Sequence, residues 1–348
     1  MKALVFNGPR DIRYETYPDP KLGSDNSVIL KVEQCSICGS DLHMYHGENI
    51  GSANYGDDVE KFCVGHEFTG EVVEVGRDVH RFRVGERVLS AGGTGCGNCA
   101  HCLSGRASRC RMKTAFGLAP HLNGGQAEFV NVPNADQILH TIPDGVSDEQ
   151  AMLLTDAMAT AYFGLSRTAI EPGDAVAVVG LGPIGLIGVE LALLLGASQV
   201  FAIDPVLERR VHAESLGARA LSPDTARQEI AEATNRRGVK RVFEASGASP
   251  AIELALKIAA RGGTASFIGL PQPGVVLPMN TVLFKDITIR AGIASVTAQW
   301  SSLIPLLQQG RLKTAGLFTH HMALADGAEA YRLFDAREDG VVKIMMSV

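Results

Sequence analysis

Hydrophobic and polar positions follow two different patterns along the 348 residues of this chain. In the first 150 residues, short runs rich in β-branched side chains alternate in part with polar positions, and glycine or proline separates them. Such runs are typical of strands, and their close spacing is typical of a β-barrel or sandwich. We therefore expect strands at 28–38, 69–76, 85–91 and 127–133.

The pattern changes after Asp156, where short apolar runs alternate with longer helical segments. This alternation is the mark of a parallel, doubly wound sheet of the α/β class. From about Ala291 the pattern is less regular, and it ends in a strand-like segment at 340–348. The apolar runs that we expect to form the parallel strands are 175–180, 200–204, 241–246 and 264–269.

The composition narrows the classes of protein that fit these patterns. The chain is 46% hydrophobic and 20% charged, as globular domains are, and its net charge of −6 includes no basic block for binding nucleic acid. The apolar segment 175–197 is long enough to span a bilayer, but it contains five glycines, Pro183 and Glu190, so we expect no membrane span. The N-terminus shows no signal peptide, and we expect a cytoplasmic protein.

A glycine-rich segment follows the first predicted parallel strand. Gly180, Gly182 and Gly185 have the spacing G-x-G-x-x-G, and Pro183 and Ile184, between the last two glycines, begin a predicted helix. In this context the glycines permit a tight turn and a close approach of the backbone to a pyrophosphate, and the helix N-terminus supplies N–H donors. We predict a dinucleotide-binding turn; the alternative is a tight turn that binds nothing.

An aspartate completes this motif. Asp204 ends the next predicted strand, 19 residues after Gly185, and can accept hydrogen bonds from both hydroxyls of an adenosine ribose. Because its carboxylate would repel a 2′-phosphate, it favours NAD(H) over NADP(H). Arg209 and Arg210 lie nearby in the sequence and leave this preference open, with Arg209 a further candidate for cofactor contact. A helix cap is the alternative role of Asp204.

Four of the seven cysteines lie in one short, glycine-flanked loop with the spacing C-x2-C-x2-C-x7-C. An odd number of cysteines and the absence of a secretory signal argue against disulfides. Four thiolates make a closed tetrahedral zinc site, which holds a fold together but has no free position for a substrate. An iron–sulfur cluster is the alternative, but such a run normally ends in Cys-Pro, and here Arg111 follows the last cysteine. We predict a structural zinc on Cys96, Cys99, Cys102 and Cys110.

A second group of possible ligands lies nearer the N-terminus. By spacing alone, Cys35-x2-Cys38 with Cys63-x2-His66 could form another closed site, of the Cys3His type. Cys35 and Cys38 could also be a redox pair, although no thioredoxin-like pattern surrounds them. Buried, unreactive thiols are the third interpretation for Cys35 and Cys63.

Several motifs occur together and in order: CGSDLH at 38–43, GHEFTGEVVEVG at 65–76, the four-cysteine loop, and the glycine turn with its distal aspartate. In this combination the chain resembles the zinc-dependent medium-chain alcohol dehydrogenases over nearly its full length. The resemblance implies a GroES-like β-rich catalytic domain, formed by 1–155 and 292–348, and a Rossmann dinucleotide-binding domain at 156–291. It also implies a homodimer or homotetramer.

The same resemblance implies a catalytic zinc on Cys38, His66 and Asp156. The third ligand is a cysteine in the animal and yeast enzymes, and an aspartate in the bacterial secondary-alcohol dehydrogenases, which are closest in pattern. Asp156 could instead lie in the first turn of a helix, where a carboxylate is favourable. Glu67 resembles the residue that approaches the zinc or lies beside its ligands, and Asp41 resembles the carboxylate that orients the histidine ligand.

The resemblance further implies a path for the proton. Ser40 resembles the hydroxyl that contacts the substrate oxygen, and His43 resembles the outer group that exchanges protons with solvent; the alternative for His43 is an ordinary surface histidine. Lys343, in the last predicted strand, is expected to reach the cofactor or to lie on the surface. The loops 46–58 and 294–300 are expected to contribute to the substrate pocket.

These parts predict an enzyme that uses two zinc ions per chain, one catalytic and one structural. It transfers a hydride between NAD(H) and an alcohol/ketone pair, and secondary alcohols are the expected small-molecule substrates. A polyol or 2,3-diol dehydrogenase, or a relative specialised for aldehydes, is the alternative within the same fold. A nonenzymatic NAD(H)-binding sensor with only a structural zinc is the alternative from another class.

Overall fold

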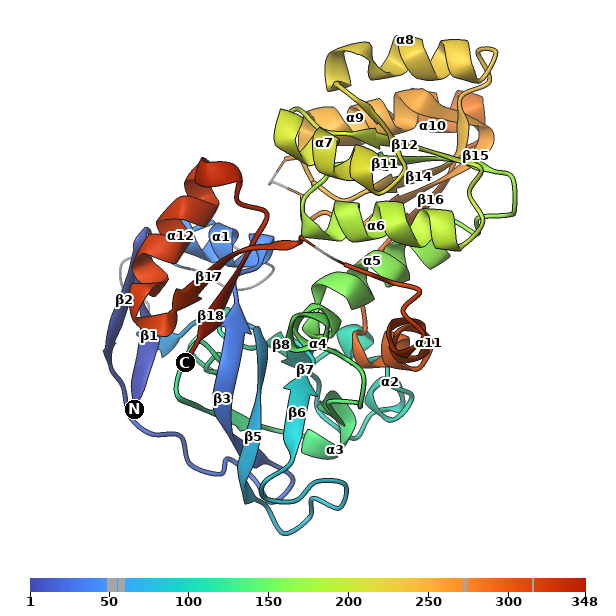
Figure 1. The fold of residues 1–348 in the computed structure, drawn as a ribbon. Coiled ribbons are helices and arrows are strands. Elements are labelled where there is room, and N and C mark those ends of the chain that lie inside the picture. The colour runs from blue at the N-terminus through green and yellow to red at the C-terminus, as the bar shows by residue number, and fades with distance from the viewer. Residues whose placement is uncertain (49–54, 56–59, 272–273, 315) are drawn as a thin grey trace. The chain divides into compact units, whose positions relative to one another are not determined.

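The computed structural model describes residues 1–48, 55, 60–271, 274–314 and 316–348 (Figure 1). The chain folds into two compact units. The first unit comprises Met1–Ala159, Ser295–Gln309 and Ala315–Val348, and the second comprises Thr160–Ala294 and Gly310–Thr314.

The first unit is built around a seven-stranded sheet with the order β10-β6-β5-β3-β18-β17, to which β9 adds by pairing with β3. The C-terminal strand β18 lies antiparallel to β3, with Met346 opposite Cys35, and β5 lies on the other side of β3. The predicted β-rich character of this part is confirmed. The strands of this sheet are β3 (Val28–Ser36), β5 (Glu67–Val75), β6 (Arg87–Ser90), β9 (Phe129–Val132), β10 (Leu139–Thr141), β17 (Phe318–Ala323) and β18 (Lys343–Ser347).

Shorter elements complete the first unit. A three-stranded sheet contains β2 (Asp11–Thr16), β1 (Lys2–Gly8) and β4 (Phe62–Cys63), and a two-stranded one contains β7 (Gly93–Thr94) and β8 (Thr114–Ala115). The helices are α1 (Gly39–Tyr45), α2 (Ala100–Leu103), η1 (Ala107–Arg109), α3 (Ala135–Ile138), α4 (Asp148–Thr155), α11 (Thr297–Gln308), η2 (Leu324–Asp326), α12 (Gly327–Ala336) and η3 (Glu338–Gly340), and α5 (Ala157–Ser166) begins in this unit and ends in the second.

The second unit contains one six-stranded sheet with the order β13-β12-β11-β14-β15-β16, and every neighbouring pair is parallel. Helices cover both of its faces (Figure 1), and the strand order reverses between β11 and β14, which is where doubly wound sheets bind their ligands. The predicted fold class is thus confirmed. The strands are β11 (Ala175–Val179), β12 (Gln199–Ile203), β13 (Arg219–Leu221), β14 (Val239–Glu244), β15 (Ala259–Phe267) and β16 (Thr288–Ala291), and the helices are α6 (Pro183–Leu194), α7 (Leu207–Ser215), α8 (Pro223–Ala233), α9 (Ser249–Ile258) and α10 (Met279–Lys285).

The apolar runs of this sheet are buried by the helices on each side. Strand residues such as Ala177, Phe201 and Val242 share one core with helix residues such as Leu256 and Ile230. None of the helices formed by the described residues is long and apolar enough to cross a membrane. The apolar segment 175–197 is divided instead between β11, the glycine turn and α6.

The junctions of the two units differ from the expected domain boundaries by a few residues. Asp156, expected to open the second domain, lies in the first unit, which extends to Ala159. It is the single residue between the end of α4 and the start of α5. The segment Gly310–Thr314 returns to the second unit, where Glu190 of α6 accepts hydrogen bonds from the backbone N–H groups of Lys313 and Thr314, at 2.6 and 3.2 Å.

Candidate active site

One sulfur, one ring nitrogen and two carboxylates converge in the first unit. Cys38 immediately precedes α1, and His66 immediately precedes β5, which begins at Glu67. Asp156 lies between two helices. One donor atom from each of these four residues lies within 4.8 Å of the others. Oδ2 of Asp156 is 3.4 Å from Sγ of Cys38 and 3.6 Å from Nε2 of His66. This donor set fits zinc, which accepts sulfur, nitrogen and oxygen ligands.

Cys35 and Cys63 belong to no metal-binding group among the described residues. Both are fully buried in strands, where burial raises the pKa of the Cys35 thiol and raises that of Cys63 to about 12. The geometry thus agrees with buried, unreactive thiols and gives no support to the closed Cys3His site.

Asp41 connects two of the converging residues. Its Oδ2 accepts a hydrogen bond from the backbone N–H of Cys38 at 2.9 Å, and its Oδ1 lies 2.8 Å from Nδ1 of His66. A carboxylate on one ring nitrogen leaves the other nitrogen to face a metal. Burial opposes the charged form of His66, but the charge of Asp41 and the hydrogen bonds that the ring donates to the carboxylates of Asp156 and Asp41 outweigh it and raise the pKa of His66 well above its usual value.

Glu67 is held by a partner that sequence reasoning did not assign to it. Lys343 neither lies on the surface nor is free for a cofactor, because its ammonium group is buried, 2.6 Å from Oε2 of Glu67, and also donates to the carbonyl of Ile37 at 3.3 Å. The other oxygen of Glu67 is buried without a hydrogen-bond partner. One oxygen of Glu67 is therefore engaged in an ion pair, whereas Asp156 lies directly beside both Cys38 and His66.

The two residues expected to carry the proton both lie on α1. Oγ of Ser40 is 3.3 Å from Nε2 of His66, which places the hydroxyl beside the converging ligands. His43 is partly buried, and its Nδ1 is 2.6 Å from Oε2 of Glu48. Most of the loop 46–58 lies outside the described residues. The expected loop 294–300 is wrong in its second half, because residues 297–300 begin α11. Trp300 of this helix is buried and donates from Nε1 to the carbonyl of Leu154 at 2.9 Å.

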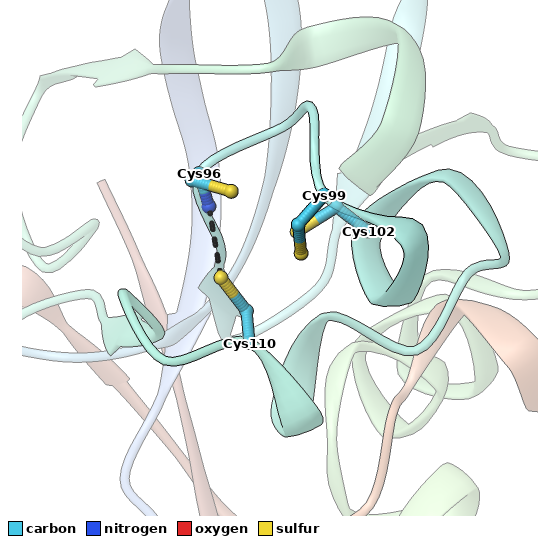
Figure 2. A group of neighbouring side chains, drawn as sticks. All are labelled: Cys96, Cys99, Cys102 and Cys110. Carbon is cyan, nitrogen blue, oxygen red and sulfur yellow. Dashed lines mark hydrogen bonds between the residues drawn. The ribbon is translucent and has the colours of Figure 1, made fainter.

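The four-cysteine loop forms a second convergence. Figure 2 shows the side chains of Cys96, Cys99, Cys102 and Cys110 turned toward a common space, and their sulfurs all lie within 4.8 Å of one another. Sγ of Cys99 is 3.6 Å from Sγ of Cys102, far longer than a disulfide bond, and all seven cysteines of the chain are free. The arrangement fits a tetrahedral zinc with four thiolate ligands.

The backbone of this loop is shaped around its sulfurs. A Cβ atom on Gly95 would lie 2.5 Å from Sγ of Cys102 and 2.9 Å from Cβ of Cys110, so only glycine fits there. Sγ of Cys110 accepts from the backbone N–H of Cys96 at 3.4 Å. Backbone hydrogen bonds from Asn98 and Cys99 lower the pKa of Cys96 to about 6, whereas burial raises that of Cys102 to about 12. Backbone N–H donors thus stabilise thiolate in the loop, as they do around bound metal.

In the second unit, the three glycines of the turn have different surroundings. Gly180 has a φ of +87°, and a Cβ atom on it would lie 2.7 Å from Cβ of Ser246. A Cβ atom on Gly185 would overlap the carbonyl oxygen of Gly180. The fold itself therefore requires these two glycines. Gly182 precedes Pro183 at the N-terminus of α6, and a Cβ there would meet no atom within 4 Å, which leaves open space for a ligand to approach the backbone.

Asp204 follows β12 and holds the turn. Its Oδ2 accepts from the backbone N–H of Leu181 at 2.7 Å, and its Oδ1 accepts from that of Val206 at 2.8 Å. Nη1 of Arg209 lies 4.0 Å from Oδ2, whereas Arg210 donates to the carbonyl of Asp204 at 2.8 Å. Asp204 does not cap α7, whose N-cap is Val206. Each carboxylate oxygen retains a lone pair for a further donor.

Comparison with known proteins agrees with this combination of units. Residues 24–144 match the family model of the alcohol dehydrogenase GroES-like domain, and residues 183–309 match that of the zinc-binding dehydrogenase. The chain is 39% identical to a probable zinc-binding alcohol dehydrogenase of Mycobacterium tuberculosis, over 97% of this chain and 86% of that protein.

Two further relatives have similar lengths. The sorbitol dehydrogenase of Bacillus subtilis is 33% identical, over 99% of this chain and 97% of that enzyme. Among solved structures, the alcohol dehydrogenase TADH from Thermus sp. ATN1 is 33% identical, with a TM-score of 0.91 and full coverage of both chains. A GroES-like unit with a doubly wound unit defines a zinc-binding oxidoreductase, and the chain belongs to the zinc-dependent medium-chain alcohol dehydrogenase family. The predicted family is confirmed.

Proposed function

We propose that this chain is an NAD(H)-dependent zinc alcohol dehydrogenase that interconverts secondary alcohols and ketones. The observation that carries the proposal is the convergence of Cys38, His66 and Asp156, three different donor types, while Glu67 beside them is engaged by Lys343. Three protein ligands leave an open coordination position, as catalytic zinc sites require. The four-cysteine loop would hold the second, structural zinc.

Each neighbouring side chain has a defined task in this proposal. A zinc ion on the three ligands would act as a Lewis acid toward an alcohol or carbonyl oxygen. Asp41 orients the ring of His66 and, through the N–H of Cys38, the start of α1. Ser40, whose hydroxyl lies beside His66, receives the proton that leaves the alcohol, and His43 passes that proton outward.

The second unit supplies the dinucleotide site. The open space at Gly182 and the N-terminus of α6, with Pro183 and Ile184 in its first turn, suit a pyrophosphate. Asp204 lies at the carboxyl end of β12 and can still accept from ribose hydroxyls, and its charge disfavours a 2′-phosphate. A nicotinamide dinucleotide held there would supply the acceptor for a hydride from the carbinol carbon. Arg209, close to Asp204, is the residue that would contact the adenosine end.

Polyols are a second candidate class of substrate. They are favoured by the 33% identity with a sorbitol dehydrogenase over nearly the whole of both chains. A panel of simple secondary alcohols, vicinal diols, polyols and aldehydes, each assayed with NAD⁺ or NADH, separates these classes by kcat/KM.

A second copy of the chain is the partner that we propose, in a homodimer or homotetramer. In the second unit, α10 exposes the apolar side chains of Leu283 and Phe284. Val276, shortly before α10 in the chain, and Ile293, shortly after the edge strand β16, are exposed as well. Such exposure is unusual on a monomer. Light scattering of the wild type and of Leu283→Glu tests the interface, since the variant should shift toward monomer. We also place the protein in the cytoplasm, because seven free cysteines fit a reducing compartment.

Metal analysis and turnover test the proposal together. The purified protein should contain two zinc ions per chain, and removal of the more labile one should abolish turnover of alcohols with NAD⁺. One zinc ion per chain, with no turnover of any member of the panel, would overturn the proposal and favour a nonenzymatic NAD(H)-binding sensor.

A further inference from the structure

A carboxylate holds the histidine that is expected to end the proton path. Nδ1 of His43 lies 2.6 Å from Oε2 of Glu48, and the side chains are 19% and 35% exposed. A contact this short, partly shielded from water, is a charge-assisted hydrogen bond. Because the carboxylate accepts, Nδ1 carries the hydrogen, and Nε2 of the neutral ring is left as an acceptor.

The carboxylate of Glu48 is itself surrounded by charged groups from other elements. Nδ1 of His46 lies 3.9 Å from Oε1 of Glu48, and Nε2 of His46 lies 2.7 Å from Oδ1 of Asp335 on α12. Arg10, which follows β1, reaches Oδ2 of Asp335 at 3.2 Å. Imidazoles and carboxylates thus alternate in one series of contacts, from His43 through Glu48 and His46 to Asp335. These contacts hold the C-terminal end of α1 in place beside Glu48.

We propose that Glu48 is a positioning residue that sets the tautomer of His43 for proton transfer. The arrangement matches the logic of the serine protease triad, in which a buried carboxylate holds the Nδ1–H tautomer and stabilises the imidazolium that forms. The proposal rests on the proposed function, because it needs an alcohol proton to carry away.

The proton is accounted for at each step. When the alcohol is oxidised, its carbinol hydrogen leaves as hydride to NAD⁺ and its hydroxyl hydrogen leaves as a proton. The hydroxyl of Ser40 takes up that proton as it releases its own, the released proton forms a bond to Nε2 of His43, and the ring becomes an imidazolium whose Nδ1–H remains on Glu48. Loss of the Nε2 proton to solvent then restores the starting tautomer, with no exchange at Nδ1.

Replacement of the carboxylate by an amide should reverse the tautomer. In Glu48→Gln the amide oxygen can accept from Nδ1 of His43, but the N–H₂ group can equally donate to Nδ1, and that second arrangement moves the ring hydrogen to Nε2 and blocks its use as an acceptor. Long-range ¹⁵N–¹H spectra of the substrate-free protein, with His43 assigned from a His43→Gln variant, should show the Nδ1–H form in the wild type. The Nε2–H form should be populated in Glu48→Gln.

Kinetics supply the second readout. The kcat for alcohol oxidation should fall in Glu48→Gln by at least about tenfold, because a positioned general base contributes roughly 10² to 10⁴. Zinc content, thermal midpoint and KM for NAD⁺ should stay near the wild-type values. Glu74→Gln, on an exposed carboxylate of β5, is the matched control and should leave both readouts unchanged.

The outcomes separate the two proposals. An unchanged His43 spectrum in Glu48→Gln overturns the positioning role whether or not the protein turns over alcohols. A reversed tautomer with unchanged kcat also overturns it, since the tautomer would then be irrelevant to proton transfer. A wild type that oxidises no alcohol contradicts the proposed function, while the tautomer of His43 can still be measured.

Discussion

The ammonium group of Lys343 lies 2.6 Å from Oε2 of Glu67, and the two side chains are 1% and 0% exposed. Lys343 begins β18 and Glu67 begins β5, the two strands on either side of β3. Burial alone would lower the pKa of Lys343, but the charge of Glu67 outweighs burial and raises it. The ammonium group therefore stays charged, and it holds the carboxyl group next to His66 in place.

Removing one charge of the pair should lower the free energy of unfolding much more than removing both charges. Lys343→Met leaves the Glu67 carboxylate buried without a partner, and we expect a loss of about 3–5 kcal/mol in the free energy of unfolding. The double variant Lys343→Met/Glu67→Gln removes that uncompensated charge and should regain much of the loss. Urea unfolding of the single and double variants measures the difference. Equal destabilisation of both would show that the pair is not coupled.

The ion pair of Lys343 with Glu67 could not be predicted from the sequence. The glycine turn, the cysteine loop and the alternation of strands and helices are local patterns, so the class of fold was predictable from them. Lys343 and Glu67 are 276 residues apart, and only the register of β18 on β3 brings them together. The contact of His43 with Glu48 was likewise missed, although five residues separate them, because no motif marks the bend after α1 that returns Glu48 to the helix.

Asp156→Asn tests the third ligand of the proposed catalytic zinc. An amide is a weaker ligand than a carboxylate, so the variant should lose one of two zinc ions during dialysis, and kcat/KM should fall by more than about 100-fold. Zinc content by mass spectrometry and steady-state kinetics check this. Asp144→Asn, on an exposed loop, is the matched control and should keep both zinc ions. Full zinc content and unchanged turnover in Asp156→Asn would contradict the assignment.

Cys110→Ser should remove the other zinc ion and destabilise the protein. A structural zinc contributes its binding free energy directly to folding, so the thermal midpoint should fall by at least about 5 °C. Cys35→Ala serves as the control, because Cys35 is buried but lies outside both groups of ligands. It should lose some stability by cavity formation and retain two zinc ions. Loss of zinc from Cys35→Ala would mean that the ligand sets are assigned wrongly.

Asp204→Asn tests the choice of dinucleotide. The amide keeps an acceptor for the backbone N–H of Leu181, loses the acceptor for that of Val206, and removes the charge that disfavours a 2′-phosphate. We expect kcat/KM with NAD⁺ to fall by about tenfold. The ratio of kcat/KM with NAD⁺ to kcat/KM with NADP⁺ should also fall, by at least the same factor. Steady-state kinetics with both cofactors measure the ratio. Asp224→Asn, on the exposed start of α8, should leave the ratio unchanged.

The stability of the second unit should depend on pH through Asp174, which is 6% exposed and accepts from Nε of Arg241 at 2.9 Å, with Nζ of Lys240 at 3.3 Å. Burial alone would raise the pKa of Asp174, but these partners lower it. A depressed pKa in the folded state stabilises the fold above the ordinary aspartate pKa, and this contribution is lost as the pH falls through the folded pKa. Asp174→Asn should therefore cost about 1.5–3 kcal/mol at pH 7, and much less near pH 3, in urea unfolding. Glu171→Gln is the control, because the side chain of Glu171 is 70% exposed and its carboxylate is 3.8 Å from Arg241; it should cost under about 0.5 kcal/mol at either pH. An equal cost for Asp174→Asn and Glu171→Gln would contradict the role of burial.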